Sequence, residues 1–256
     1  MQFRFLGTGT SQGVPTIACK CTVCTSTDTR DRRNRAAALI SHPNGQNLLI
    51  DAGADFRQQM LCYQVKNIDY VLITHAHFDH IAGLEDLRTF CFIQDKAMPI
   101  GSTAPVLAAL RERYAYIFVE NPYPGSARFD LFEIDKDTPF SVGSFEIMPI
   151  EVMHGRLPIL GFRFKDFTYI TDCKTINATE IEKIKGTKTL VINALHHDIH
   201  PTHLNLTECL RLIKILAPEK AYITHVSHHM GLYTEVEKTL PPNVFLAYDG
   251  LVLDMD

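Results

Sequence analysis

The sequence of 256 residues has no tryptophan and no apolar run of the roughly 18 residues that a membrane-spanning helix needs. Residues 1–6 lack the basic start and the apolar stretch of a secretory signal peptide. No block of lysine and arginine is longer than the short cluster at residues 30–35, and the net charge is -4. These absences argue against a membrane protein and against a nucleic-acid partner, and they favour a cytoplasmic protein.

Cysteine is also scarce, with seven residues, an odd number that does not suit a disulfide framework. Three of them, Cys19, Cys21 and Cys24, follow a Cys-x-Cys-x-x-Cys spacing. Three thiolates at this spacing can wrap around one tetrahedral zinc ion when a fourth ligand comes from elsewhere in the chain. We therefore predict a zinc-binding loop at about residues 19–24, with a loop of free thiols or a redox pair as the alternatives.

Histidine, in contrast, is abundant, and most of the 12 histidines fall in clusters. The order His75-x-His77-x-Asp79-His80 directly follows residues 69–73, a β-branched and aromatic run that is typical of a buried strand. Imidazoles and carboxylates bind zinc and similar ions, and burying so many polar groups without a cation is unfavourable. The pattern favours a metal site over a solvated, histidine-rich loop.

The same arrangement recurs along the chain, where an apolar strand ends and a histidine or aspartate stands just beyond it. It is found at His75, His154, Asp172, His196 and His225. Side chains at the ends of neighbouring strands can converge at one edge of a sheet although they are far apart in sequence. Hydrophobic residues make up 46% of the chain, and no internal linker is evident, so we expect one α/β domain over residues 1–256.

The motif at residues 75–80, followed by His154, Asp172 and His225, resembles that of the metallo-β-lactamase fold hydrolases. The resemblance implies a four-layer αβ/βα sandwich with a site for two divalent ions, zinc or manganese. The implied ligands are His75, His77 and His154 for one ion, Asp79, His80 and His225 for the other, and Asp172 as a bridge. Two such ions can hold a hydroxide at neutral pH for attack on phosphorus.

Within that group, the glycine loop at residues 7–15, the cysteine cluster and residues 224–228 are most similar to the phosphoribosyl cyclic phosphodiesterases of phosphonate breakdown. In those enzymes three cysteines and one histidine hold a structural zinc, and the histidine corresponds to His228. The resemblance implies a metal-dependent phosphodiesterase that cleaves a small, cyclic phosphodiester, and it allows a homodimer.

The predicted catalytic residues are Asp79, within the metal motif, and His203, which the family pattern offers as general acid for the departing oxygen. Three neighbouring histidines compete with His203 for that role: His196, His197 and His200. Asp51 follows a strand and could accept a hydrogen bond from a ligand histidine. Four further residues could contact phosphate or simply be solvated: Ser11, Gln12, Arg156 and Lys174.

Several other functions fit the same metal ligands. One is a ribonuclease Z-like tRNA phosphodiesterase, although a net charge of -4 and the lack of a basic arm favour a small substrate. A thioesterase or lactonase would use the same ions on a carbonyl carbon, whereas a zinc-stabilised binding or scaffold protein would keep them without catalysis. The segments at residues 196–200 and 115–143, the latter predicted to be irregular, are expected to set specificity.

Overall fold

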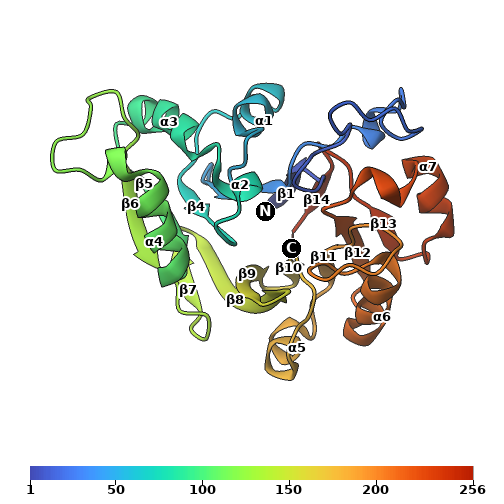
Figure 1. The fold of residues 1–256 in the computed structure, drawn as a ribbon. Coiled ribbons are helices and arrows are strands. Elements are labelled where there is room, and N and C mark those ends of the chain that lie inside the picture. The colour runs from blue at the N-terminus through green and yellow to red at the C-terminus, as the bar shows by residue number, and fades with distance from the viewer. Residues whose placement is uncertain (256) are drawn as a thin grey trace.

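Two seven-stranded β-sheets face each other in the computed structural model, which describes residues 1–255 (Figure 1). The strands of the first sheet, in spatial order, are β14 (Val252–Asp254), β1 (Gln2–Gly7), β2 (Ala37–Ser41), β3 (Asn47–Ile50), β4 (Tyr70–Leu72), β5 (Met98–Ser102) and β6 (Phe129–Glu133). Those of the second are β13 (Val244–Leu246), β12 (Lys220–Thr224), β11 (Thr189–Asn193), β10 (Phe167–Tyr169), β9 (Leu157–Phe164), β8 (Phe145–His154) and β7 (Phe140–Val142).

Helices cover the outer face of each sheet, so the predicted four-layer sandwich is confirmed (Figure 1). The helices of the first half are α1 (Phe56–Cys62), α2 (Phe78–Ile81), α3 (Arg88–Ile93) and α4 (Ala104–Arg113). Those of the second half are α5 (Ala178–Ile184), α6 (Leu206–Leu216) and α7 (Tyr233–Val236). The first half of the chain thus supplies most of the first sheet and its helices, β14 from the C-terminal end completes that sheet, and the two sheets meet face to face.

Apolar side chains fill three layers between these elements. The layer between the sheets is rich in aromatic rings, and Phe3 of the first strand lies with its ring centroid 4.7 Å from that of Phe167 in the opposite sheet. The other two layers join each sheet to its own helices. Because a fully buried phenylalanine contributes about 1.5–3 kcal/mol, the middle layer fixes how the two sheets lie against each other.

Parallel pairing brings the ends of several strands to one edge of each sheet. In the first sheet β3, β4, β5 and β6 pair in parallel, and in the second sheet β10, β11, β12 and β13 do so. Side chains that follow the carboxyl ends of parallel strands share that edge, where sites are commonly assembled. The histidines and aspartates at the strand ends therefore lie along the same edge of the fold.

Helix α6 shows how the local sequence produces these elements. Asn205 caps it by accepting from the backbone N–H of Glu208, and the Glu208 carboxylate accepts from the Asn205 N–H in return. This reciprocal pair satisfies two backbone donors that a helix start otherwise leaves unpaired. Four of its apolar residues recur at helical spacing and are buried against the second sheet: Leu206, Cys209, Ile213 and Leu216.

One expectation for the chain was wrong. Residues 115–143 are not wholly irregular, because they contain β6 and β7. Both strands lie at a sheet edge and carry polar residues between short apolar ones, so the alternation that marks a strand is weak there.

Within residues 1–255, no helix has the length and apolar character required to cross a lipid bilayer.

Candidate metal centre

The motif that follows β4 forms one side of a polar cluster. After the strand the chain turns into the short helix α2, whose first turn carries Asp79 and His80. The preceding histidines meet, with His75 Nε2 3.0 Å from His77 Nδ1. The absence of a side chain at Gly53 permits this packing, because a Cβ there would lie only 1.9 Å from the carbonyl oxygen of Asp79.

The other predicted ligands of the cluster come from strand ends of the second sheet. Asp172 follows β10 after a short turn, and His225 directly follows β12. His154 was expected just beyond its strand but is the last residue of β8, where it pairs with Leu157 of β9. The structure brings all three side chains to the histidine motif.

The ligand atoms fall into overlapping groups whose members lie within 4.8 Å of one another. Two of these groups are His75, His77 and His154 on one side, and Asp79, His80 and His225 on the other. Asp172 is close to members of both groups: it forms one further group with His75 and His80 and another with His154 and His203. One of its carboxylate oxygens lies 3.2 Å from His80 Nε2 and the other 3.0 Å from His225 Nε2. The geometry is that of two neighbouring three-ligand clusters with a carboxylate between them.

Three residues at this edge adopt the left-handed backbone conformation. The φ angles are 63° at Asp51, 55° at Asp172 and 54° at His225. Aspartate, asparagine and histidine enter this region more readily than most residues with a Cβ, yet it remains costly. Each of the three strands β3, β10 and β12 thus leads into a residue that is both polar and left-handed.

The charges in the cluster perturb one another strongly. Burial would raise the pKa of Asp172, but the imidazoles of His225 and His80 outweigh it and hold this pKa well below its usual range. Burial would lower the pKa of His80, yet the carboxylates of Asp51, Asp172 and Asp79 outweigh it and hold that pKa well above its usual range. The cluster therefore concentrates carboxylates and imidazoles in a buried space, and this donor set is one that a divalent cation can bind.

Unpartnered nitrogen atoms point to the same conclusion. Buried atoms without a hydrogen-bond partner include Nε2 of His80 and both ring nitrogens of His225. Burial also holds the pKa of His75 well below its usual range, which leaves a neutral imidazole able to bind a metal ion. Leaving a buried polar atom unsatisfied costs about 1–3 kcal/mol, and mixed imidazole and carboxylate ligands suit zinc or manganese. The residues present fit two divalent ions.

Other residues hold the ligand histidines in place. Nδ1 of His80 donates to the Asp51 carboxylate at 2.7 Å, which also accepts from the backbone N–H and hydroxyl of Thr74, both at 2.9 Å. Nδ1 of His154 donates to the carbonyl oxygen of Thr202 at 2.9 Å. The sequence indicated Asp51 but not its partner Thr74, which no motif marks as a hydrogen-bond donor to it. It gave no sign of Thr202 either, because a backbone carbonyl has no sequence signal.

We expect Asp51→Asn to weaken metal binding by about 10- to 100-fold, the usual effect of losing the carboxylate behind a ligand histidine. The amide cannot present two acceptor oxygens to His80 and Thr74 at once. Competition titration against a metal-binding dye measures this change. The matched control is Asp95→Asn, because Asp95 also has a positive φ of 45° but a side chain that is 95% exposed. Equal affinity in the two variants would show that Asp51 does not support the ligand.

The three cysteines of the predicted zinc loop lie beside His228. Nδ1 of His228 is 3.4 Å from the Cys19 sulfur and 3.3 Å from the Cys21 sulfur, and Cys24 belongs to the same group. The contact with His228 is the main cause that lowers the pKa of Cys21 to about 6, whereas burial raises the pKa of Cys24 to about 11. Four such donors in one cluster could hold a structural metal ion.

The proposed general acid, His203, borders the metal cluster. Its Nδ1 lies 3.6 Å from the Asp172 carboxylate, and its ring stacks on that of His225 with 4.9 Å between centroids. Burial, followed by the nearby His225, lowers the pKa of His203 to about 3. Among its rivals, His200 lies next to it, while Nε2 of His197 bonds instead to the carbonyl oxygen of Met230. The ring centroid of His196 lies 5.9 Å from that of His200 and 6.2 Å from that of His229. Of the four histidines, His203 is the one grouped with His154 and Asp172, and His200 packs against its ring.

One of the four candidate phosphate contacts is already paired. Nζ of Lys174 lies 2.8 Å from both carboxylate oxygens of Glu208, the residue that completes the cap of α6. This ion pair neutralises the lysine and assigns it a structural role.

Comparison with known proteins places these features in context. Residues 46–226 match the family described as the beta-lactamase superfamily domain. A solved structure described as a new diphosphatase from the PhnP family is 34% identical in sequence to this chain and superposes on it with a TM-score of 0.92. The match covers 100% of this chain and 98% of that structure.

Two curated relatives match this chain over only about half of their own length or less. An octanoyltransferase of Porphyromonas gingivalis is 41% identical over 257 residues, which cover 100% of this chain but 52% of the relative. A ribonuclease Z of Thermococcus kodakarensis is 30% identical over 144 residues, which cover 54% of this chain and 43% of the relative. The chain thus spans about half or less of the length of these curated relatives.

Proposed function

This chain belongs to the metallo-β-lactamase superfamily, and from that premise we propose that it is a dinuclear metal-dependent phosphodiesterase acting on a small phosphodiester. The observation that carries the proposal is the full-length similarity to a PhnP-family diphosphatase, together with the buried histidine and aspartate cluster. The name of the octanoyltransferase relative is not carried over, because this chain matches only 52% of that protein.

In this proposal the strand-end residues hold two divalent ions. His75, His77 and His154 would hold one, Asp79, His80 and His225 the other, and Asp172 would contact both. Bound ions of this kind supply positive charge to phosphoryl oxygens and make water acidic enough to ionise near neutral pH. The protein contributes the fixed ligand geometry, which Asp51 and the carbonyl of Thr202 stabilise from behind.

His203 is the proposed proton donor to the departing oxygen. Its imidazole borders the cluster, and Nδ1 has no hydrogen-bond partner. Its pKa of about 3 means that it is neutral at pH 7 by itself. An anionic phosphoryl group beside the ring would favour the imidazolium and raise this pKa, which is the direction that proton donation requires. Asp79 completes the proposed catalytic set as a ligand.

The cysteine loop is proposed to hold a third ion, a structural zinc, through Cys19, Cys21, Cys24 and His228. Residues 1–256 would then act as one hydrolase domain with this loop at its side. A homodimer stays a prediction.

A second candidate is hydrolysis of a diphosphate bond, which the description of the PhnP-family structure favours. The tRNA phosphodiesterase fits less well, since the ribonuclease Z relative matches 54% of this chain and the net charge is -4. Thioester and lactone hydrolysis require the same ligands but have no comparable support, and a non-catalytic scaffold leaves the full ligand set without a role.

The test is a substrate panel with protein of measured metal content. We expect bis(p-nitrophenyl) phosphate and small cyclic diesters to be hydrolysed at rates well above those of thioesters and lactones. The panel includes a diphosphate diester and a precursor tRNA to measure the two other phosphoryl reactions. Chelated protein restored with zinc or manganese serves as the control. Metal-loaded protein that cleaves thioesters or lactones but no phosphoryl compound would overturn the proposal.

A further inference from the structure

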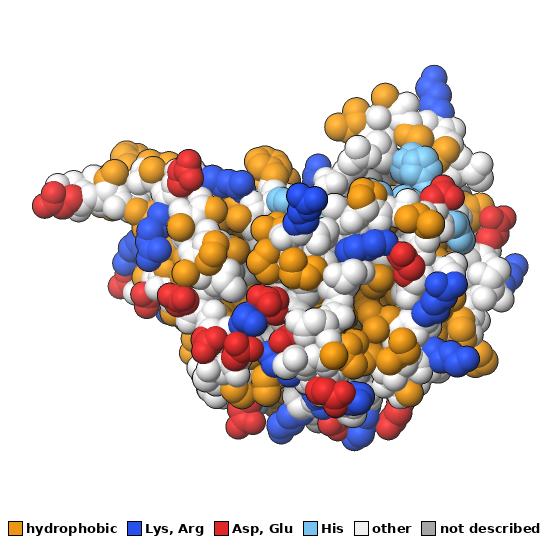
Figure 2. Space-filling view, turned by 60° about the horizontal axis from the view of Figure 1, so that its bottom comes forward, with side chains coloured by type: hydrophobic (Ala, Val, Ile, Leu, Met, Phe, Trp, Pro, Cys, Tyr) orange, Lys and Arg blue, Asp and Glu red, His pale blue; other side chains and the backbone are white. Residues whose placement is uncertain are grey.

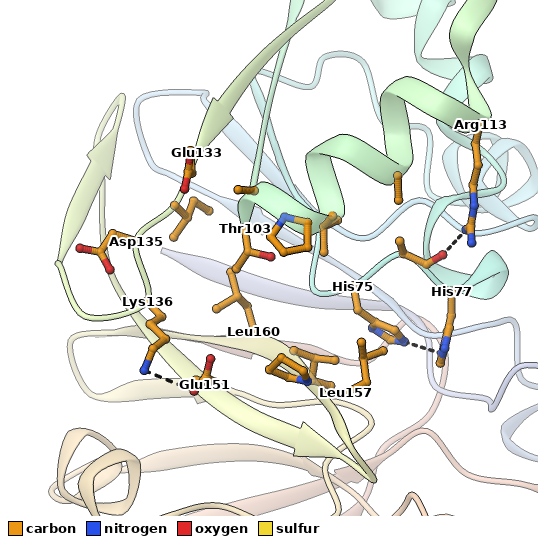
Figure 3. A pocket seen from close by; sticks show the side chains of 18 residues that line it. His75, His77, Thr103, Arg113, Glu133, Asp135, Lys136, Glu151, Leu157 and Leu160 are labelled. Atoms are coloured by element: carbon orange, nitrogen blue, oxygen red, sulfur yellow. Dashed lines mark hydrogen bonds and ion pairs between the residues drawn. The ribbon is translucent and has the colours of Figure 1, made fainter.

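A cavity of about 790 Å³ opens beside the metal centre, and His75 and His77 form part of its wall (Figure 3). It lies between the first half of α4 and the beginning of β9. The cavity is therefore continuous with the proposed phosphoryl site and extends away from it along the first sheet.

Apolar side chains form both long walls. The principal ones are Pro105, Val106 and Ala109 on α4, and Leu157, Pro158 and Leu160 on β9. Leu157 is 40% exposed although it is large and apolar. On the face that Figure 2 shows, hydrophobic side chains gather in the middle, between histidines above and acidic groups below. An apolar ligand here would remove this surface from water, which is favourable.

The far end of the cavity is negatively charged. Glu133, Asp135 and Glu151 line it together with Lys136, whose Nζ lies 3.3 Å from the Glu151 carboxylate (Figure 3). Hydrogen bonds from the Asp137 backbone N–H and from a threonine hydroxyl lower the pKa of Asp135, which therefore stays ionised. Because Glu151 is paired with Lys136, the carboxylates of Glu133 and Asp135 remain to repel a second anionic group on a ligand.

The end near the metal centre has the opposite character. Arg113 reaches towards His77 and donates to the carbonyl oxygen of Ala76 (Figure 3). Its guanidinium, together with any cations held by the histidines, favours an anion at this end. The cavity thus runs from an anion-binding end, between apolar walls, to an anion-repelling end.

We propose that this cavity binds an apolar ester substituent of the substrate, an alkyl or aryl group that ends in an uncharged or cationic group. The assignment rests on the proposed function, because it takes the phosphoryl group to lie at the metal centre. A substrate with a second phosphate at its far end, such as a phosphorylated sugar, would be disfavoured by Glu133 and Asp135. The selected substrate is therefore a phosphoester with an apolar body.

Binding of alkyl phosphonates tests the assignment without requiring turnover. Calorimetry with metal-loaded protein is expected to show affinity rising by about two- to fourfold for each methylene from methyl to hexyl phosphonate, the gain expected for burying a CH₂ group. A hexyl phosphonate that carries a carboxylate at the end of its alkyl chain should bind at least tenfold more weakly than hexyl phosphonate itself. Equal affinity along the series would overturn the assignment.

Two variants test whether the alkyl chain of the phosphonate lies in this cavity. Leu157→Asp and Ala109→Asp place a charge on opposite walls, and each should reduce the preference for hexyl over methyl phosphonate by at least tenfold. The control is Ile215→Asp, because Ile215 is 67% exposed on α6 and does not line this cavity. Metal content and methyl phosphonate affinity report whether the centre itself is intact. A preference that survives both wall variants would place the alkyl chain elsewhere.

Turnover separates this inference from the proposed function. If alkyl phosphonates bind by chain length but no phosphodiester is hydrolysed, the cavity assignment stands and the proposed function fails. If phosphodiesters are hydrolysed at rates that do not depend on the alkyl chain, and phosphonate affinity is equally flat, the proposed function stands and the cavity assignment fails.

Discussion

Asp172→Ala is expected to lower kcat for a small phosphodiester by at least about 1,000-fold, because it removes the carboxylate that lies between both metal-ligand groups. A loss of this size corresponds to about 4 kcal/mol of transition-state stabilisation, within the range that metal ions supply. The measurement is single-substrate kinetics at saturating metal, with metal content determined on the same samples. Far-ultraviolet circular dichroism should be unchanged, because Asp172 lies at the sheet edge and not in an apolar layer.

Backbone conformation could complicate this result, since Asp172 has a φ of 55° and alanine is disfavoured there. Asp172→Asn addresses the problem, because asparagine tolerates this conformation while losing the charge. Asp95→Ala is the matched control at an exposed position with a φ of 45°. If Asp172→Asn retained near-normal kcat with full metal content, the carboxylate would have no bridging role.

Cys21→Ser is expected to reduce bound zinc by about one equivalent per chain and to lower Tm by roughly 5 °C or more. Structural zinc contributes folding energy directly, and serine is a poor zinc ligand. Cys21 lies 3.3 Å from His228, so its loss also removes a link between the N-terminal loop and the segment after β12. Atomic absorption and differential scanning calorimetry measure the two effects.

Cys62→Ser is the matched control, because Cys62 is an exposed free cysteine outside the four-ligand group. It should leave zinc content and Tm unchanged. An unchanged zinc content in Cys21→Ser would mean that the loop does not hold a metal ion. Phosphodiesterase activity should fall much less in this variant than in Asp172→Ala, because the proposed catalytic ligands are all in place.

The sequence predicted much of the histidine and aspartate cluster because its residues follow recognisable strands. His75 to His80 lie in one short motif after a strand of the first sheet, and Asp172 and His225 each follow an apolar run of the second sheet. Strand pairing within each sheet, together with the packing of the two sheets on each other, accounts for their convergence. His228 was inferred only from the family resemblance, because more than 200 residues separate it from Cys19. Nothing in the spacing of the cysteines identifies the fourth ligand.

Other features depended on packing that no local pattern encodes. The edge strands β6 and β7 carry too few apolar residues to stand out. The apolar cavity exists because α4 lies across the start of β9, and those segments are about 50 residues apart in sequence. Thr202 supports His154 through its carbonyl oxygen, which any residue type would provide. Side-chain chemistry can therefore be recognised in a sequence more readily than cavities or backbone contacts, which depend on packing between distant segments.

The left-handed residues Asp51, Asp172 and His225 limit how this centre can change over evolutionary time. Each costs about 1 kcal/mol relative to an ordinary backbone, an expense that the fold carries only while metal binding is selected. In a descendant without that selection, substitution of these residues by glycine would relieve the backbone strain and increase stability. Substitution by asparagine would alter the backbone conformation least. Drift should therefore leave glycine and asparagine at these three strand ends before it alters the apolar layers beneath them.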